Sequence, residues 1–196
     1  MRRIDVAGFE QKFRADIDPW NYRQSPFERI KRKLLLRACG CAKRGRGLEL
    51  GCANGETTRF LAPLCLTLTA LDGSSTALVE ARRRAGSSGR VKFLHAILPQ
   101  QMPAGPFDLI VASEIAYYLT AHALERLAKS VIRALAPGGR IVVLHHRRLF
   151  SDAAQNSAIA HERLCHLLQS SMHSTRHAAY PQFNIVSFEK RLRIVR

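Results

Sequence analysis

Five short apolar segments, separated by stretches with helical spacing, constrain the fold of this chain most strongly. The apolar segments run over residues 47–50, 66–71, 91–94, 107–112 and 140–144. Amphipathic helices are predicted between them near residues 55–62, 75–85 and 121–135. Strands that alternate with helices are typical of a parallel sheet covered on both faces. The pattern therefore predicts an α/β fold, a three-layer sandwich around a mostly parallel sheet.

Further elements are predicted at both ends of this core. Ser25-Pro26 followed by Glu28 has the spacing of a helix start, with Ser25 as the cap and Glu28 completing a capping box; Gly40 is a plausible stop. After a helix near 153–171, a turn separates two extended segments that would form an antiparallel edge pair. We expect one domain over residues 1–196, with residues 1–40 as an N-terminal extension and residues 41–196 as the core.

Charge and cysteine content narrow the class of protein. The 196 residues carry 31 Lys and Arg against 15 Asp and Glu, a formal charge of +16, and 46% are hydrophobic, which excludes low-complexity disorder. Five cysteines without a Cys-x-x-Cys pair favour reduced thiols and predict no metal site. With no apolar run of ~20 residues and no signal-peptide core, we expect a cytoplasmic protein. The excess positive charge is compatible with nucleic acid, an anionic membrane surface or solubility alone.

The ligand site is predicted at the carboxyl ends of the strands. The first strand ends in Glu-Leu-Gly-Cys-Ala-Asn-Gly at residues 49–55, where two glycines let the backbone turn sharply and approach a ligand. This spacing differs from the Gly-x-Gly-x-x-Gly of pyrophosphate binders and from the phosphate-binding loop. Asp72 ends the second strand 21 residues after Gly51, where a carboxylate is well placed to accept hydrogen bonds from two ribose hydroxyls.

These motifs, with Phe107-Asp108-Leu109-Ile110 and Leu135-Ala136-Pro137-Gly138-Gly139, resemble those of class I S-adenosylmethionine-dependent methyltransferases. The resemblance covers roughly residues 40–145 and implies a Rossmann-like fold with a seven-stranded sheet. It also implies that S-adenosyl-L-methionine lies over the 51–55 loop and that Glu114 faces the active site. The residues expected to bind the cofactor are Arg23, Glu49, Gly51, Cys52, Ala53, Gly55, Asp72, Gly73 and Ser74.

A narrower resemblance covers nearly the whole chain. Asp18-Pro19-Trp20 with Arg23, Ser25-Pro26-Phe27-Glu28 with Lys31, and Ser113-Glu114-Ile115-Ala116-Tyr117-Tyr118-Leu119 resemble the nodulation protein S (NodS-like) methyltransferases. Members of that family N-methylate a free amine on the terminal glucosamine of a chitin-oligosaccharide signal precursor. The resemblance implies an enzyme that N-methylates a small or oligosaccharide acceptor.

Roles for individual side chains follow from the reaction. Methyl transfer is an in-line displacement, so the protein mainly aligns the reactants and sets the protonation state of the nucleophile. Glu114 is expected to orient the acceptor or to bind the methionine ammonium group through water. His145 and His146 could reach the acceptor from the end of the fifth strand, and His145 is the second catalytic candidate. Arg23 is expected to pair with the cofactor carboxylate from an N-terminal lid. A sugar ring could stack on the aromatic side chains of Trp20, Tyr117 and Tyr118, and one of the two adjacent tyrosines is expected to belong to the core instead.

Two departures from the class I pattern stand out, and two other functions stay open. The stretch after the third strand, His95-Ala96-Ile97-Leu98-Pro99, has no acid for the adenine amino group, and His145-His146-Arg147-Arg148 is unusually basic for a site around a cationic cofactor. A nucleic-acid methyltransferase would explain basic clusters such as Arg82-Arg83-Arg84, although the Asn/Asp-Pro-Pro-Tyr motif of enzymes that methylate flipped bases is missing. A non-catalytic module that binds the cofactor is the other alternative.

Overall fold

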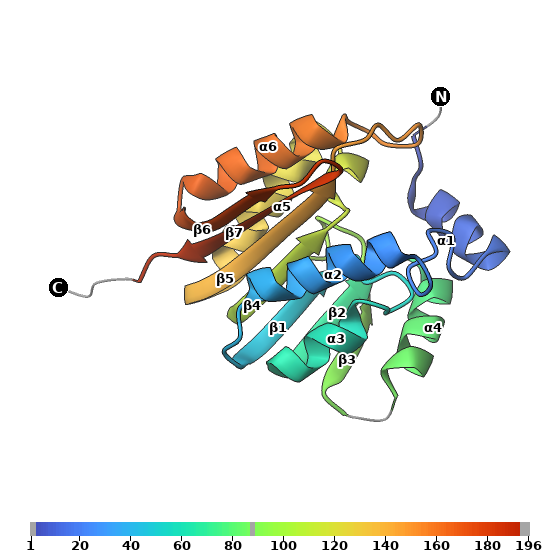
Figure 1. Cartoon of the computed structure of the whole chain (residues 1–196), viewed down its shortest axis with the longest axis horizontal. Helices are drawn as coiled ribbons and strands as arrows, with labels where there is room; N and C mark the ends of the chain where they lie inside the picture. Colours follow the sequence, from blue (N-terminus) through green and yellow to red (C-terminus); the bar gives the residue numbers. More distant parts are fainter. Residues whose placement is uncertain (1–2, 87–88, 193–196) are drawn as a thin grey trace.

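A seven-stranded mixed sheet with the order β3-β2-β1-β4-β5-β7-β6 forms the centre of the protein (Figure 1). The computed structural model describes residues 3–86 and 89–192. Strands β1 to β5 are parallel, whereas β7 is antiparallel to both β5 and β6. The strands are β1 (Arg44–Leu50), β2 (Cys65–Asp72), β3 (Val91–His95), β4 (Phe107–Ser113), β5 (Leu135–His146), β6 (Met172–Ala179) and β7 (Phe183–Lys190). The predicted α/β fold with an antiparallel edge pair is confirmed.

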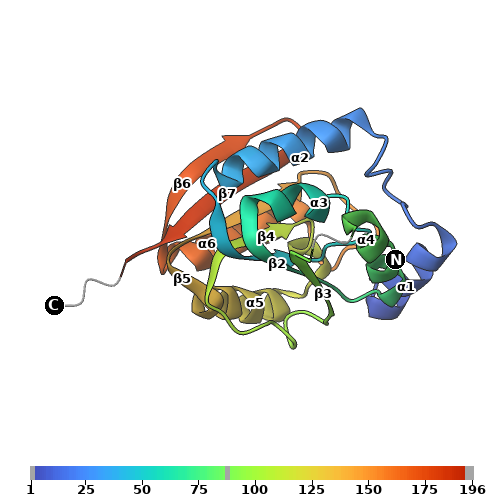
Figure 2. The same cartoon turned by 90° about the horizontal axis from the view of Figure 1, so that it is seen from below.

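Helices cover both faces of this sheet (Figures 1 and 2). They are α1 (Val6–Ala15), α2 (Pro26–Cys39), α3 (Thr58–Leu61), α4 (Ser75–Ala85), α5 (Ala121–Ala134) and α6 (Ser157–Gln169), with short 3-10 turns at η1 (Ala62–Leu64) and η2 (Ala116–Tyr118). Successive side chains of β5 enter opposite cores: Ile141 and Val143 pack with α5 and α6, and Val142 and Leu144 pack with α2 and α3. This alternation is that of a strand buried on both faces.

Helix α2 begins as predicted, but Glu28 has a different role. The Ser25 hydroxyl accepts a hydrogen bond from the Glu28 backbone N–H at 3.3 Å, and Gly40, with φ of 90°, caps the end of the helix. The backbone N–H of Ser25 donates to the Asn21 carbonyl, while the Glu28 carboxylate accepts from Lys31 Nζ at 2.8 Å. The predicted capping box is therefore wrong in its second half, because the Glu28 side chain is drawn into a buried ion pair.

Helix α1 was not predicted, and it lies across the carboxyl end of the sheet beside α4 (Figure 1). The Asp5 carboxylate caps it by accepting from the Gly8 N–H at 2.8 Å. The Glu10 carboxylate accepts from the hydroxyls of Ser74 and Thr76, both at 2.7 Å, and these hydrogen bonds lower the pKa of Glu10 to about 2. On the opposite side, Lys12 pairs with Asp152 at 2.8 Å. Two side chains of α1 thus fix the helix on the rest of the protein, Glu10 at the start of α4 and Lys12 at the loop before α6.

The helices found in the described part of the chain, residues 3–86 and 89–192, include none that is long and apolar enough to cross a membrane. The predicted one-domain organisation over residues 1–196 stays a prediction, and residues 1–2, 87–88 and 193–196 of that range lie outside the described residues.

Candidate active site

The loop after β1 turns where the order of the strands reverses, between β1 and β4. Gly51 and Gly55 have φ of 69° and 77°, a region that favours glycine. A Cβ atom at Gly55 would lie 2.7 Å from the Cα of Ala81, so the loop packs directly on α4. Such a switch point at the carboxyl ends of parallel strands is where α/β sheets bind ligands.

Asp72, at the end of β2, fixes this loop. One carboxylate oxygen accepts from the backbone N–H of Ala53 and the other from that of Ser74, both at 2.8 Å. Burial raises the pKa of Asp72 above its usual value, and the two amides act in the opposite direction. Each carboxylate oxygen has a second acceptor position, so the group can still receive two hydroxyls from a ribose.

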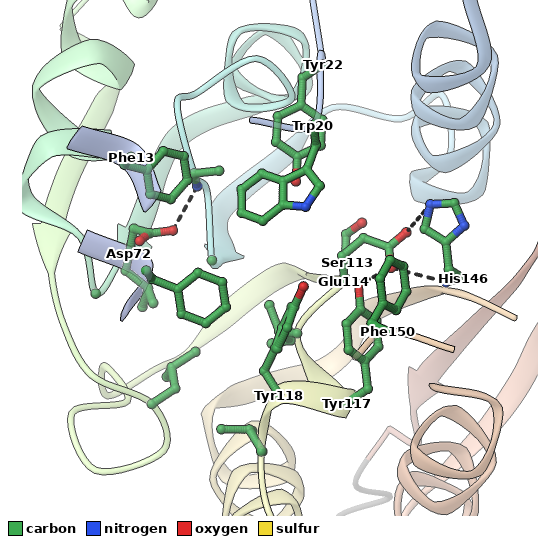
Figure 3. A pocket seen from close by; sticks show the side chains of 18 of the residues that line it. Phe13, Trp20, Tyr22, Asp72, Ser113, Glu114, Tyr117, Tyr118, His146 and Phe150 are labelled. Atoms are coloured by element: carbon green, nitrogen blue, oxygen red, sulfur yellow. Dashed lines mark hydrogen bonds and ion pairs between the residues drawn. The ribbon is translucent and has the colours of Figure 1, made fainter. Parts of the chain in front are cut away.

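A cavity of about 370 Å³ opens at the carboxyl ends of β1, β2 and β4 (Figure 3). Its volume falls within the ~300–1,000 Å³ typical of small-molecule sites. One side is made of backbone and apolar groups together with one acid: Gly51, Ala53, Asp72, Gly73, Ala96, Ile97 and Leu98. The other side is aromatic and charged: Trp20, Tyr22, Phe27, Glu28, Lys31, Glu114, Tyr117, Tyr118, His146 and Phe150.

Glu114 lies at the centre of the charged side. Its φ is 58°, an uncommon conformation for a residue other than glycine, and its side chain turns back toward β5. One carboxylate oxygen accepts from Lys31 Nζ at 2.9 Å. The other accepts from the Tyr117 hydroxyl at 2.9 Å and from the backbone N–H of His146 at 3.1 Å. The carboxylate is therefore held in one orientation by three donors.

Lys31, on the buried face of α2, connects the acids of this wall. Its Nζ lies 2.8 Å from the Glu28 carboxylate, 2.9 Å from that of Glu114 and 3.2 Å from His146 Nε2. An ammonium group has three N–H donors and no acceptor, so these three partners use all of them. His146 Nε2 must then be the acceptor, which leaves the ring proton on Nδ1, 3.3 Å from the Gln182 carbonyl oxygen.

The electrostatic environment keeps Glu114 ionised. Burial by itself would raise the pKa of Glu114, but the charge of the adjacent Lys31 ammonium group outweighs burial and lowers this pKa. A carboxylate with a lowered pKa is a weak base. Glu114 is therefore suited to orient an N–H donor by accepting a hydrogen bond from it.

Aromatic rings complete the cavity. Trp20 lies between Phe13 and Tyr22, with ring centroids 5.5 and 5.6 Å away. The ring of Tyr117 is stacked on Phe150 at 5.0 Å and is buried, so it belongs to the wall and presents chiefly its hydroxyl. Tyr118 packs edge-on against Phe9 of α1 at 4.8 Å.

Comparison with known proteins identifies the family. The sequence profile of the family described as Nodulation protein S (NodS) matches residues 5–178. The chain belongs to the NodS family. Nodulation protein S of Rhizobium tropici is 37% identical to it over 127 residues, which make up 64% of this chain and 53% of that protein. The match thus spans about half the length of this curated relative.

A solved structure extends the likeness over the whole fold. The N-methyltransferase NodS from Bradyrhizobium japonicum WM9, in complex with S-adenosyl-L-homocysteine, superposes with a TM-score of 0.82 and 25% identity, covering 95% of this chain and 99% of that one. A trans-aconitate 2-methyltransferase from Streptomyces avermitilis is 36% identical over 98 residues, 47% of this chain and 36% of that protein. The predicted class, that of S-adenosylmethionine-dependent methyltransferases, and its cofactor are confirmed.

The cavity of this NodS-family chain suits that cofactor. Asp72 offers acceptors for a ribose, and Ala96, Ile97 and Leu98 form the apolar wall expected for adenine in the absence of an acid. Gly51 brings bare backbone to the cavity, and a Cβ there would lie 2.7 Å from a side-chain carbon of Ile115. When bound, S-adenosylmethionine supplies a methyl group activated by a positively charged sulfur.

The structure brings together most of the residues predicted for the site. The cavity is lined by Trp20, Gly51, Ala53, Asp72, Gly73, Glu114, Tyr117 and Tyr118. Six other predicted residues do not line it: Arg23, Glu49, Cys52, Gly55, Ser74 and His145. The roles assigned to all fourteen residues stay predictions. The eight lining residues could contact a ligand in the cavity directly, whereas the other six could not.

Three of these six residues, Arg23, Ser74 and His145, lie outside the loop at residues 49–55. Arg23 is exposed on the linker before α2, and its backbone N–H donates to Asp18. Ser74 caps α4 by accepting from the Ala77 N–H. His145 is fully buried, whereas its neighbour His146 faces the cavity.

The glycine-loop residues Glu49 and Cys52 line a second, smaller cavity of about 40 Å³ that adjoins the first. The Thr58 hydroxyl donates to the Glu49 carboxyl at 2.6 Å, and burial raises the pKa of Glu49 to about 8. Burial also raises the pKa of the Cys52 thiol well above its usual value, which makes it a poor nucleophile.

The places of Glu28 and Lys31 in the cavity wall were not predicted, whereas His146 was expected, with His145, to be able to reach the acceptor. Glu28 and Lys31 stand one turn apart on α2, and both are less than 9% exposed. The helical spacing of the sequence contained a signal for this placement. Glu28 and Lys31 lie on the same face of α2 as the buried Leu35, whereas the charged side chains of an amphipathic helix ordinarily face solvent.

Proposed function

We propose that this chain uses S-adenosylmethionine to N-methylate a free amine on a small or oligosaccharide acceptor, such as the de-N-acetylated glucosamine of a chitin oligosaccharide. The observation that carries the proposal is the Glu114 carboxylate, held by three donors on the wall of the cavity and flanked by aromatic rings. An amine N–H can donate to this carboxylate. A carboxylate acceptor would meet three acids among the lining residues, Glu28, Asp72 and Glu114.

The geometry supports a mechanism in which the amine attacks and Glu114 orients it and stabilises the charge that develops on it. The amine must be neutral to attack, and the hydrogen bond to Glu114 would direct its lone pair along the line of displacement. As the N–C bond forms, the C–S bond breaks and its electron pair returns to sulfur. The nitrogen then carries the positive charge, which the Glu114 carboxylate stabilises. Because the pKa of Glu114 is lowered, the extra proton leaves to solvent after transfer.

The aromatic side chains support a sugar acceptor. Trp20 and Tyr118 offer flat apolar faces with a polar atom at the edge, the combination on which sugar rings pack. The relatives named Nodulation protein S and N-methyltransferase NodS point to the same chemistry. A cytoplasmic location remains part of the proposal.

Nucleic acid, the alternative raised by the charge of +16, receives no support from the cavity. Among its lining residues, the three acids Glu28, Asp72 and Glu114 outnumber the two permanently charged bases, Lys31 and Arg148; the third basic residue is His146. A phosphate backbone would need a basic path into the site.

Transfer of a radiolabelled methyl group tests the proposal. De-N-acetylated chitin oligosaccharides, their fully N-acetylated counterparts, small primary amines and bulk RNA are compared as acceptors at equal concentration. The proposal predicts label on acceptors with a free amine and none on the N-acetylated oligosaccharides. Label on RNA alone would overturn it, and so would equal label on both oligosaccharides.

A further inference from the structure

We infer that His161, acting through His145, is a positioning residue that holds Glu114 in its reactive orientation. His161 is on α6 and neither histidine lines the cavity, so neither is expected to touch the reactants. The inference rests on the proposed role of Glu114. It gives a function to a buried polar pair that the reaction itself does not use.

The turn that carries Glu114 needs external support. Glu114 has a positive φ of 58°, which costs energy for a residue with a side chain and persists only where neighbours impose it. Two backbone N–H groups of this turn donate hydrogen bonds to the end of β5. The Glu114 N–H donates to the Leu144 carbonyl at 2.9 Å, and the Ala116 N–H donates to His145 Nε2 at 3.1 Å.

The hydrogen bonds of the two histidines fix where their protons lie. Because the backbone N–H of Ala116 can only donate, His145 Nε2 must be unprotonated, and the proton of this ring is on Nδ1. His145 Nδ1 lies 3.1 Å from His161 Nδ1 and donates to it. The proton of His161 is then on Nε2, 3.6 Å from the sulfur of Cys165.

This placement of the protons makes His161 the residue that favours the His145 tautomer with its proton on Nδ1. Without an acceptor at His161 Nδ1, the His145 proton could move to Nε2, where it would face the Ala116 N–H and break the support of the turn. Both rings are buried, 0% exposed for His145 and 3% for His161. Burial is the main cause that lowers their pKa values, to about 3 and about 4, so both stay neutral near pH 7.

Two substitutions of His161 separate this role from simple packing. His161→Leu fills the site but removes the acceptor, and we expect kcat to fall about tenfold with little change in the KM for S-adenosylmethionine. His161→Asn places an amide oxygen near the position of Nδ1, and we expect it to keep most of kcat. Leu164→Ala is the matched control, since Leu164 lies in the same helix and is buried in the same core but has no contact with the histidine pair through hydrogen bonds.

The experiment measures kcat, KM and thermal unfolding for the wild type and these three variants, with a free amine as acceptor. Loss of kcat in His161→Leu, rescue in His161→Asn and a normal kcat in Leu164→Ala support the inference. A kcat for His161→Leu within twofold of the wild type overturns it. An equal loss in His161→Asn or in Leu164→Ala also overturns it, because packing alone would then explain the effect.

Nuclear magnetic resonance keeps this test independent of the proposed activity. In ¹⁵N-labelled protein we expect His145 to be protonated at Nδ1 and not at Nε2, and the Ala116 amide signal to shift in His161→Leu. If no amine is methylated by the wild type, the proposed function fails, and these spectra still decide the inference. A proton on His145 Nε2, or an unchanged Ala116 signal in His161→Leu, contradicts it.

Discussion

Replacing Lys31 by methionine tests whether its ammonium group keeps Glu114 ionised in the charged wall of the cavity, which consists of Glu28, Lys31, Glu114 and His146. Methionine keeps the length of the side chain on α2 but removes the ammonium group that pairs with Glu28 and Glu114 at 2.8 and 2.9 Å. One buried carboxylate, that of Glu28, and one largely buried carboxylate, that of Glu114, then lack their shared cation. Breaking a buried ion pair in this way costs about 3–5 kcal/mol, unless the acids take up a proton instead. For a chain of this size, we expect the Tm to fall by roughly 6–20 °C.

The same change alters the chemistry of Glu114. Burial raises its pKa, and Lys31 is the strongest of the charges that lower it. Without Lys31 the pKa of Glu114 should rise above its usual value, so that the carboxyl is protonated over part of the neutral range. A protonated carboxyl no longer orients an amine as an acceptor, and we expect kcat at pH 7 to fall by about 100-fold. Raising the pH through the new pKa should restore part of the activity.

Steady-state kinetics between pH 6 and 9 check this prediction for Lys31→Met. Lys33→Met, on the exposed face of the same helix, is the matched control and should keep the wild-type profile. A Lys31→Met enzyme with wild-type kcat and an unchanged pH profile would refute the reasoning. A loss of kcat that is the same at every pH would show that Lys31 acts only on structure.

Three further predictions follow from the cofactor side and from α1. Asp72→Ala removes the acceptors for ribose and releases the Ala53 amide; calorimetry should show S-adenosylhomocysteine binding weakened at least about tenfold, and unchanged affinity would remove Asp72 from the site. Arg23→Ala should leave that affinity within twofold, because Arg23 is exposed outside the cavity, and a large loss would restore its predicted role as a carboxylate ligand. Glu10→Gln should lower the free energy of unfolding at pH 7. The pKa of Glu10 is depressed from 4.5 to about 2 in the folded protein. Its contribution is therefore present above pH 4.5 and lost as the pH falls toward 2, so denaturation curves of the two proteins should converge over that range; a constant difference would contradict this.

The fold could be predicted because its signals are local and periodic. The apolar segments at 66–71 and 107–112 correspond to β2 and β4, and no end differs by more than one residue. The glycine loop and Asp72 were predicted from the positions of the strand ends. Helix α1 was missed although Val6, Phe9 and Phe13 recur at helical spacing, because its partners Ser74 and Asp152 are distant in sequence.

The charged wall could not be predicted for a similar reason. Lys31 and Glu114 are 83 residues apart and meet only when α2 packs on the end of β5. The choice between two adjacent histidines depends on which face of β5 each side chain occupies, and a shift of one residue reverses it. The pairing of His145 with Asn184 of β7 fixes this register, and it turns His146 toward the cavity.

A single-turnover measurement with Glu114→Gln tests the central claim most directly. Glutamine keeps the shape of the side chain but removes its charge and turns one acceptor into a donor. With saturating radiolabelled cofactor and a de-N-acetylated chitin oligosaccharide, the rate of methyl transfer should fall by about 100-fold, while the affinity for S-adenosylhomocysteine stays within twofold. A Glu114→Gln protein that transfers the methyl group at the wild-type rate would contradict the assignment of Glu114 as the group that orients the amine.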